Sequence, residues 1–391
     1  MTTHTQIDAL IVGAGPAGLM AAEVISAAGF SVLVAEAKPS PARKFLMAGK
    51  SGLNLTKNEP LVPFFAAYDP TPDTLRDALT AFGPDQVITW AEGLGQEMFT
   101  GSSGRVFPKA MKASPLLRAW LSRLTAQGVE LRRNWRMTAL GDEVRFDTPE
   151  GSAKVSAKTV VLALGGASWA RLGSNGAWAD LVSPYVALAP FMASNVGLLR
   201  DWSPHMTRYF GAPIKGVCLR SGAYSTRGEC VISARGFEGG GIYAITRGLR
   251  TGAPLMIDLL PDWPAERVKQ TLIQRKPKET LTTFLKRAFR LPPEKIALMM
   301  ECAGSKPTDL QTALKHLEIT DIRLRPVDEA ISTAGGVRFD SLTENLAASS
   351  RPDLFFAGEM LDWDAPTGGY LLTACLATGR LAGLGVIKAL S

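Results

Sequence analysis

The sequence predicts an α/β fold in which one domain, contributed by both ends of the chain, is interrupted by a second domain of different character. Three observations predict this. An apolar strand near the N-terminus runs into a glycine-rich turn and an Ala-rich helix. The middle of the chain holds short strand-like segments broken by Gly and Pro, followed by helices that begin at prolines. The last residues return to an apolar strand and a small-residue helix. With 391 residues, the chain is long enough for two or three domains.

The N-terminal elements follow one another in the order of a βαβ unit. A short apolar run at Ile7–Val12 predicts a buried parallel strand. The turn Gly13–Gly18 has the spacing G-x-G-x-x-G, and Leu19–Ala28 predicts a helix packed on a sheet. A second strand is expected at Ser31–Ala35, with Glu36 at its end. The full order, rather than the glycines alone, predicts a dinucleotide-binding unit.

Each part of this unit has a physical task. Gly13 permits the tight turn, Gly15 lets the backbone approach a pyrophosphate, and Gly18 lets helix and strand pack closely. The helix N-terminus offers N–H groups to phosphates, and Glu36 can accept hydrogen bonds from a ribose. The motif does not separate FAD from NAD. We expect these cofactor contacts: Gly13, Ala14, Gly15, Pro16, Ala17, Gly18, Glu36, Ala37 and Lys38.

The segment that follows, residues 41–56, is rich in groups that bind phosphate. Lys44, Lys50, Ser51, Gly52 and Asn54 form a loop that a dinucleotide fold would place near the carboxyl ends of its strands. A solvated connection explains the same composition equally well. Of these residues, the cofactor prediction includes Lys44, Gly52 and Asn54.

Further elements complete the first domain. Glycine and proline positions and apolar patterning predict two helices within 72–93, a helix at Pro115–Gln127, a strand at Val129–Arg133, a hairpin from Val144–Phe146 and Ala153–Val155, and a strand at Thr159–Leu164. The last strand ends in a glycine pair where backbone can approach a cofactor again. The cofactor prediction therefore includes Gly165 and Gly166, and also Met137.

The predicted domain boundaries follow changes in composition. The first part covers 1–190, a β-rich insert covers 191–262, a helical insert covers 263–325, and the first domain resumes over 326–391. Within the inserts we expect strands at Gly216–Arg220, Glu229–Ser233 and Leu255–Leu259, and helices at Pro264–Gln274, Pro277–Phe289, Pro293–Cys302 and Pro307–Leu317.

The positive charge of the chain is concentrated in the helical insert. Residues 264–325 contain 13 Lys/Arg and 7 Asp/Glu, a net charge of +6 out of +7 for the whole chain. A solvated helical face has this composition, and so does a surface that contacts phosphates.

The C-terminal segment indicates which dinucleotide is bound. A strand at Asp353–Ala357 precedes Gly358 and Glu359, and a glycine pair opens a helix at Leu371–Leu384. The N-terminus of such a helix stabilises negative charge that develops at the N1/O2 side of a reduced flavin. This element favours FAD over NAD. The expected contacts here are Gly358, Glu359, Asp364, Gly368, Gly369 and Tyr370.

Taken together, these motifs resemble the BaiN/RdsA-like (YhiN-type) flavoproteins of the glutathione-reductase-like superfamily. The shared motifs are Gly13–Gly18 with Glu36, Arg43–Thr56, Arg105–Pro108, Leu164–Ser168, Thr333–Val337, and Ala357–Glu359 through Thr367–Tyr370. The resemblance implies a Rossmann-type FAD-binding domain with an inserted β-barrel-like and helical domain.

The chain departs from this family at two places, which identifies it as part of a divergent subgroup. It has Ser51–Asn54 where relatives carry Gly-Arg-Cys-Asn, and Gly236–Gly241 where relatives carry a Ser-Gly-Pro turn. Roles of the missing arginine and cysteine therefore do not transfer to this chain.

The resemblance implies an FAD-dependent oxidoreductase that uses hydride transfer at flavin N5. Family members make dihydrouridine in ribosomal RNA, an RNA modification, so this RNA is a candidate partner through the basic insert. The candidate proton donors are Lys50, Glu238 and Tyr370. An amine oxidase or other small-molecule dehydrogenase, and a non-catalytic FAD-binding module, are the alternatives. NAD(P)H is a candidate electron donor, although no second complete glycine motif follows a strand.

Several classes of site and location are not expected. The four cysteines and three histidines are scattered, which argues against disulfides and a metal site. No apolar run was judged long enough to span a bilayer, so no membrane partner is expected. No signal peptide is recognisable, and a cytoplasmic location is expected.

Overall fold

The computed structural model describes residues 6–50 and 52–391, and it divides into two compact units. Unit 1 extends to Met192 and resumes from Ser332 to Ser391, whereas unit 2 comprises Ala193–Ile331. These divisions fall close to the expected boundaries after 190 and 325. Both parts of the insert, before and after the expected boundary at 262, belong to unit 2, as expected of one inserted domain.

A parallel sheet forms the centre of unit 1. Its strand order is β20-β9-β1-β2-β6, with all neighbouring pairs parallel. Because β2 and β9 lie on opposite sides of β1, the chain changes direction across the sheet there, and ligands bind at such switch points. The strands are β1 (Gln6–Val12), β2 (Val32–Glu36), β6 (Glu130–Arg133), β9 (Gly151–Leu162) and β20 (Arg351–Phe356).

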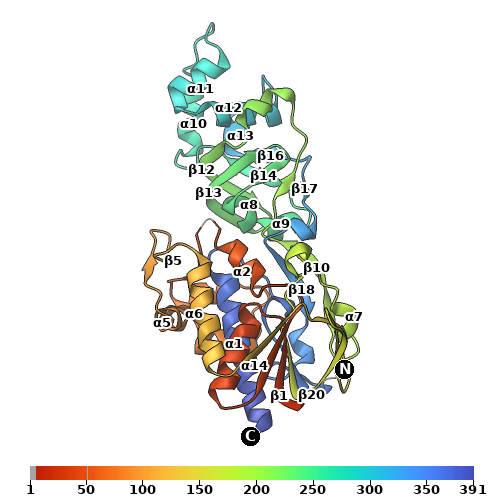
Figure 1. Ribbon diagram of the computed structural model, residues 1–391. Coiled ribbons are helices and arrows are strands. Elements are labelled where there is room, and N and C mark those ends of the chain that lie inside the picture. Colours follow the sequence, from red (N-terminus) through yellow and green to blue (C-terminus); the bar gives the residue numbers. More distant parts are fainter. Residues whose placement is uncertain (1–5, 51) are drawn as a thin grey trace. The chain divides into compact units, whose positions relative to one another are not determined.

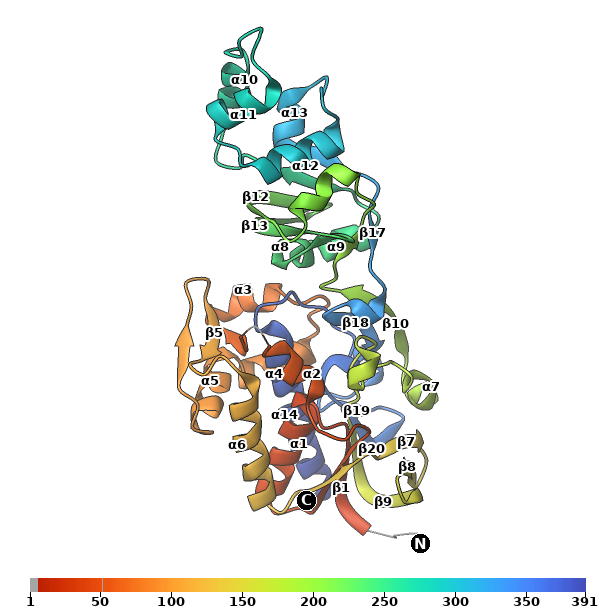
Figure 2. The ribbon, with the colours of Figure 1, turned by 45° about the horizontal axis from the view of Figure 1, so that its top comes forward.

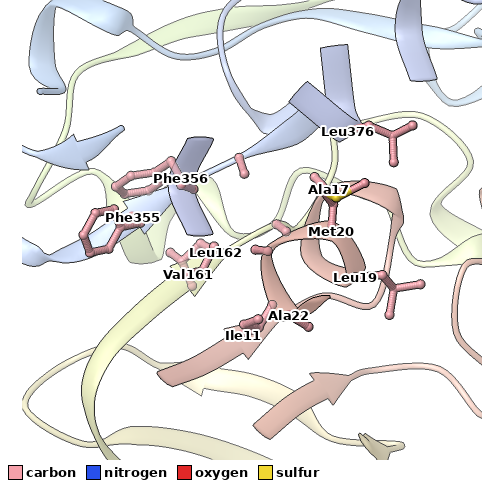
Figure 3. Close-up of a cluster of buried hydrophobic side chains, with 14 of the residues drawn as sticks. Ile11, Ala17, Leu19, Met20, Ala22, Val161, Leu162, Phe355, Phe356 and Leu376 are labelled. Atoms are coloured by element: carbon pink, nitrogen blue, oxygen red, sulfur yellow. The ribbon is translucent and has the colours of Figure 1, made fainter. Parts of the chain in front are cut away.

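Two helices from opposite ends of the chain contact each other in unit 1. They are α1 (Pro16–Ala27) and α14 (Tyr370–Leu390), which Figure 1 shows side by side. The contact is close because a Cβ at Gly379 would lie 2.3 Å from the Ala17 carbonyl oxygen. Figure 3 shows the apolar side chains that α1 and α14 pack with the strands, among them Ile11 and Phe356, both fully buried.

Shorter elements surround this core. The helices are α2 (Arg43–Ala48), α3 (Leu61–Ala66), α4 (Asp73–Ala81), α5 (Pro84–Glu92), α6 (Ala113–Ala126) and α7 (Ala179–Val182), with 3₁₀ turns at Ala170–Leu172, Phe339–Ser341 and Gly358–Met360. The additional strands are β3 (Thr56–Lys57), β4 (Met98–Thr100), β5 (Arg105–Pro108), β7 (Arg136–Ala139), β8 (Val144–Thr148) and β19 (Ala347–Ala348). Strands β3, β5 and β4 form a separate antiparallel sheet. Strands β10 (Leu188–Ser194) and β18 (Ser332–Val337), where the chain leaves and re-enters unit 1, pair with each other.

Unit 2 combines an antiparallel sheet and helices around one hydrophobic core. Buried side chains of the sheet, such as Ile214 and Ile257, belong to the same cluster as Phe284 and Leu298 of the helices. This shared core joins the β-rich and the helical parts of the insert into one unit. The sheet order is β16 (Leu317–Ile319), β15 (Leu255–Asp258), β12 (Pro213–Ser221), β13 (Tyr224–Ser233), β14 (Gly236–Glu238), β11 (Leu198–Leu199) and β17 (Arg323–Leu324). The helices, several of which Figure 2 shows, are α8 (Gly240–Ala244), α9 (Thr246–Arg250), α10 (Ala265–Leu272), α11 (Leu281–Phe289), α12 (Pro293–Ala303) and α13 (Leu310–Lys315), with 3₁₀ turns at Pro204–Tyr209 and Val327–Glu329.

Several predicted elements differ from the structure. The second strand of the expected hairpin and the expected strand at 159–164 are one continuous strand, β9, because it pairs with β8 and then with β1. Residues 43–48, expected to be loop, form α2, and α11 begins only at Leu281. The expected helix at 307–317 is shorter because Leu317 starts β16.

Helix α14 is longer than expected and corrects a second expectation. By length and composition it could cross a membrane, contrary to the judgement that no apolar run was long enough. In the structure, 61% of its most apolar window is buried. Its apolar surface therefore packs inside unit 1, as in the core helix of a globular domain.

Candidate functional site

A cleft lies at the carboxyl ends of β1, β2, β9 and β20, where the parallel sheet changes direction. It encloses about 820 Å³ of space, part of it open to solvent. Segments far apart in the sequence line it: the N-terminal glycine turn and α2, the strands around 135 and 163, and the turn after β20. The polar and charged residues of the lining are Glu36, Arg43, Lys44, Ser174, Glu359 and Cys375.

In the glycine turn at the start of α1, two glycines are needed for close packing and a third leaves space for a ligand. A Cβ at Gly13 would lie 2.3 Å from the Ala163 carbonyl oxygen, and a Cβ at Gly18 would lie 2.0 Å from the Gly13 carbonyl oxygen. Both glycines are therefore required by the protein itself. Gly15 has an ordinary φ of −82°, and its Cβ would meet no protein atom within 4 Å. The open space beside Gly15 suits a pyrophosphate that approaches the backbone.

The carboxylate of Glu36 is held at the end of β2. Its oxygens accept hydrogen bonds from the backbone N–H groups of Ala14 (3.0 Å) and Lys38 (2.8 Å). Burial raises the pKa of Glu36, and these hydrogen bonds oppose the shift. Trp135, whose backbone N–H donates to the Glu36 carbonyl, lines the cleft with Met137. The arrangement provides an acceptor for ribose hydroxyls next to an apolar wall for an adenine.

A second polar group lies where α2 meets the turn after β20. The Lys44 ammonium donates to the Ser168 hydroxyl at 2.8 Å and pairs with the Glu359 carboxylate at 2.7 Å. Glu359 also accepts the backbone N–H of Thr333 at 3.1 Å. Lys44 and Glu359 both line the cleft and are only partly exposed. This pair can exchange hydrogen bonds with the hydroxyls of a bound ligand while its charges stay balanced.

Other predicted residues gather at the N-terminus of α14, outside the cleft lining. The Tyr370 hydroxyl accepts from the Lys57 ammonium at 2.8 Å and donates to the Glu59 carboxylate. Burial raises the pKa of Tyr370 to about 12; Glu59 acts in the same direction and Lys57 opposes it. The phenol is thus protonated at neutral pH. Asn54, three residues before Lys57 in the sequence, has a buried side-chain oxygen without a hydrogen-bond partner in the described chain.

The predicted site residues fall into three groups. Those that line the cleft are Gly13, Gly15, Pro16, Ala17, Glu36, Ala37, Lys44, Met137, Gly165, Gly358 and Glu359. Those near it that support its walls are Ala14, Gly18, Lys38 and Gly166. Those outside its lining are Gly52, Asn54, Asp364, Gly368, Gly369 and Tyr370. Ser51, named with this loop, lies outside the described residues.

Protein packing accounts for two of the predicted glycines. A Cβ at Gly166 would lie 1.7 Å from the Thr333 hydroxyl oxygen, and one at Gly369 would lie 2.3 Å from the Thr56 carbonyl carbon. Their lack of a side chain is needed by neighbouring protein atoms. Asp364 is buried, and its backbone exchanges two hydrogen bonds with Asp69.

None of the three candidate proton donors lines the cleft. Lys50 is exposed and lines a different cavity. Glu238 belongs to unit 2 and forms an ion pair with Arg325. Tyr370 is the one candidate of the three that lies in unit 1 with a hydrogen-bonded cation beside it.

Some lining residues were missed by the sequence prediction. Arg43, Trp135 and Cys375 line the cleft, as do Leu172, Gly173 and Ser174. Arg43 belongs to the motif at residues 43–56, of which the predicted cofactor contacts are Lys44, Gly52 and Asn54. Burial raises the pKa of Cys375 to about 12, so it is a neutral thiol and no nucleophile. Nothing in the sequence signals the segment around Leu172, which enters the cleft through the turn that follows β9.

The chain is similar to known proteins over nearly its whole length. The model of the HI0933-like protein Rossmann domain family matches residues 7–385. The chain belongs to this family. It is 28% identical to the 3-dehydro-bile acid delta(4,6)-reductase of Clostridium scindens, covering 95% of this chain and 97% of that protein. It is 25% identical to the ribosomal RNA dihydrouridine synthase of Escherichia coli, covering 93% and 94%.

The fold is shared with solved flavoprotein structures. The 3-ketosteroid delta1-dehydrogenase of Sterolibacterium denitrificans has a TM-score of 0.56 at 12% identity, covering 98% of this chain and 99% of that one. The resemblance stated from the motifs and the Rossmann-type FAD-binding fold are both confirmed. The protein is an FAD-dependent oxidoreductase.

The residues of the cleft fit this cofactor. The open backbone at Gly15 and the buried Nε of Arg43, which has no acceptor among the described residues, suit a pyrophosphate. Glu36 would hold a ribose, and Lys44 with Glu359 would hold further hydroxyls. When bound, FAD supplies a hydride donor and acceptor at its N5 atom.

Proposed function

We propose that this protein adds hydrogen across a carbon–carbon double bond conjugated to a carbonyl, with a uridine of ribosomal RNA as the first candidate substrate. The curated relatives carry this proposal because they match nearly end to end. Their names describe one type of reaction. A dihydrouridine is a uridine reduced at C5–C6, and a delta(4,6)-reductase acts on double bonds conjugated with the 3-oxo group of its substrate.

The charge distribution favours a polyanionic substrate. Unit 2 contains 21 Lys/Arg and 14 Asp/Glu, a net charge of +7, whereas unit 1 contains 22 of each kind. The whole net charge of the chain therefore belongs to unit 2. RNA phosphates are attracted by such a surface, and the attraction depends on salt concentration.

Some cations of the helical segment are buried or paired with a carboxylate, and we do not expect these to contact RNA. Lys295 and Lys315 are buried: Lys295 donates to two carbonyl oxygens, and Lys315 pairs with Asp258 at 2.7 Å. Arg287 is paired with Glu279. Exposed cations with no ion pair among the described residues are Arg267, Lys269, Arg275, Lys276, Lys278, Lys286, Arg290, Lys306 and Arg323. Several belong to the loop between α10 and α11, where Ile273 is 78% exposed and available to a base.

The reaction also needs a proton for the second carbon, and Tyr370 is the candidate that its surroundings favour. The phenol keeps its proton at neutral pH, and the Lys57 ammonium at 2.8 Å can replace a proton that Tyr370 gives up. In the structure the phenol hydrogen points to Glu59, so donation to a substrate requires the hydroxyl to rotate.

A small-molecule enone is the second candidate substrate. The relative with the higher identity, at 28%, is named for a bile acid rather than for RNA. In that case the unit 2 charge is a solvated surface. The two candidates share the same reaction and differ only in what carries the double bond. NADPH or NADH is the electron donor we propose for both.

Mass analysis of ribosomal RNA from a deletion strain tests the RNA candidate. We expect one dihydrouridine to disappear and to return with the wild-type gene, and to return poorly with a Lys276→Glu, Lys278→Glu variant. Lys388→Glu, an exposed charge in unit 1, is the control. An unchanged dihydrouridine content would exclude this substrate.

The reaction type is tested separately with purified holoenzyme. Flavin reduced anaerobically by NADPH should be reoxidised by a conjugated enone or a uridine-containing RNA, and not by a saturated ketone. Reduction of the oxidised flavin by an amine, or reoxidation of the reduced flavin by O₂ with no reaction toward an enone or RNA, would contradict the proposal.

A further inference from the structure

A second cavity adjoins the cofactor cleft in unit 1. It encloses about 950 Å³ of space that opens to solvent. It lies between the C-terminal half of α2 and the start of α6. Arg43 and Leu172 line both cavities, so the two are neighbours. None of the residues predicted from the sequence to contact the cofactor lines this second cavity.

The lining of this cavity is strongly cationic. It includes Arg43, Lys50 and Lys112, and it contains no Asp or Glu. This is unusual for its surroundings, because unit 1 has equal numbers of cationic and anionic residues. Within residues 6–50 and 52–391, none of the three cations has an ion-pair partner. Three cations that form no ion pair among the described residues, gathered around one hollow, favour an anionic ligand.

Arg43, whose Nε also suits the FAD pyrophosphate, lies at the boundary of the two cavities. Its Nε is buried and has no hydrogen-bond partner in the described chain, and its Nη1 donates to the Ser40 hydroxyl at 3.3 Å. A buried guanidinium N–H without an acceptor is costly. Because Arg43 lies between the two cavities, its guanidinium can bind phosphoryl oxygens from either side.

The N-terminus of α6 adds backbone donors to the same cavity. The helix has 14 residues, and its N-cap Lys112 provides no side-chain cap. Lys112, Ala113 and Ser114 line the cavity, so the N–H groups of the first turn lie at its wall. Gly49 allows the end of α2 to approach the start of α6 closely, because a Cβ there would lie 2.8 Å from the Ala113 nitrogen.

We propose that this cavity is a phosphate-binding subsite for a second nucleotide, bound beside the FAD cleft. Its donors match a phosphoryl group: a guanidinium, two ammonium groups, two hydroxyls and a helix N-terminus. The phosphate belongs either to the pyridine nucleotide that reduces the enzyme or to the RNA backbone next to the target base. The binding stands on the cavity alone, whereas its source rests on the proposed function.

Calorimetric titration of the FAD-loaded protein with inorganic pyrophosphate at low salt tests the site. Lys112→Glu and Lys50→Glu should each weaken binding about ten- to a hundredfold. Arg118→Glu is the matched control, because Arg118 is exposed on the same helix but does not line the cavity. Arg43 is left intact because it also lines the FAD cleft. Melting temperature and FAD content should be unchanged in all variants.

Two results would overturn the subsite: no measurable binding of pyrophosphate to the wild type, or equal weakening by Lys112→Glu and Arg118→Glu. The source is then assigned with the same variants. A raised KM for NADPH, measured as anaerobic bleaching of the flavin, assigns the electron donor. Weaker anisotropy binding of a uridine-rich RNA with unchanged NADPH kinetics assigns the substrate. Unchanged behaviour toward both nucleotides would remove the functional role.

These arms also separate this inference from the proposed function. If no RNA or enone reoxidises the flavin, the proposed reaction fails while pyrophosphate binding at Lys112 is unaffected. If the reaction is found but Lys112→Glu changes no binding constant, the subsite fails and the reaction stands.

Discussion

Gly15→Ala is the substitution that best separates cofactor binding from folding. The new methyl group would meet no protein atom within 4 Å, and the backbone at φ −82°, ψ 179° is accessible to alanine. Alanine restricts the unfolded chain but is a weaker N-cap than glycine, so we expect the stability of the apoprotein to change by less than about 0.5 kcal/mol.

The same methyl group would occupy space that we assign to the pyrophosphate. Forcing a methyl into a close contact costs about 1–3 kcal/mol, which corresponds to roughly 5- to 150-fold weaker FAD binding. Thermal unfolding of the apoprotein measures the first quantity, and fluorescence titration with FAD measures the second.

Two further glycines provide the controls. Gly228→Ala in β13 also meets no atom within 4 Å, and it should leave FAD affinity unchanged while raising stability by no more than about 1 kcal/mol. Gly18→Ala would place a Cβ 2.0 Å from the Gly13 carbonyl oxygen, and it should destabilise unit 1 itself. An FAD affinity of Gly15→Ala within about twofold of the wild type would refute the close approach of a phosphate to this backbone.

Three other predictions concern charged groups of unit 1. Glu23 accepts hydrogen bonds from the indoles of Trp90 and Trp120 and from Arg123. Glu23→Ala should therefore lower the free energy of unfolding, measured in urea, by about 3 kcal/mol without changing FAD affinity. A loss below about 0.5 kcal/mol would contradict this. Lys44 and Glu359 form a partly exposed ion pair. A double-mutant cycle with Lys44→Met and Glu359→Gln should give a coupling free energy of about 1 kcal/mol in FAD binding. Additive effects would show that the pair does not act as a unit. Because the pKa of Tyr370 is raised from 10.0 to about 12, the stability linked to its proton is complete below pH 10 and is lost as the pH rises to about 12. Tyr370→Phe should therefore approach the wild type in stability across that range, and a constant difference between them would be evidence against the raised pKa.

The N-terminal half of the cofactor site was readable because local sequence determines it. The strand, the glycine turn and Glu36 are adjacent in the chain, and each carries a distinctive residue type. The same holds for Gly358 and Glu359, which directly follow a buried strand. The segment at Leu172–Ser174 was missed because it enters the cleft only through tertiary packing, and its residues have no chemical signature.

Composition could not show which glycines serve the ligand and which serve the protein. Gly15 and Gly166 look alike in sequence, yet a Cβ at Gly15 meets nothing and one at Gly166 meets Thr333. Similarly, the count of 13 cations in the helical segment could not show that Lys295 and Lys315 are buried. Composition also could not show that β16, which follows the helices, completes the sheet of the β-rich part.

The meeting of α1 and α14 has a consequence for the time at which the protein acquires its cofactor. A ribosome makes α1 before unit 2 and α14 after it, while all of unit 2 emerges in between as one uninterrupted segment. Until β20 and α14 leave the exit tunnel, β9 lacks its neighbour β20 and α1 has an uncovered apolar face. FAD uptake therefore belongs after translation, and the nascent chain must protect a half-finished domain while it completes another.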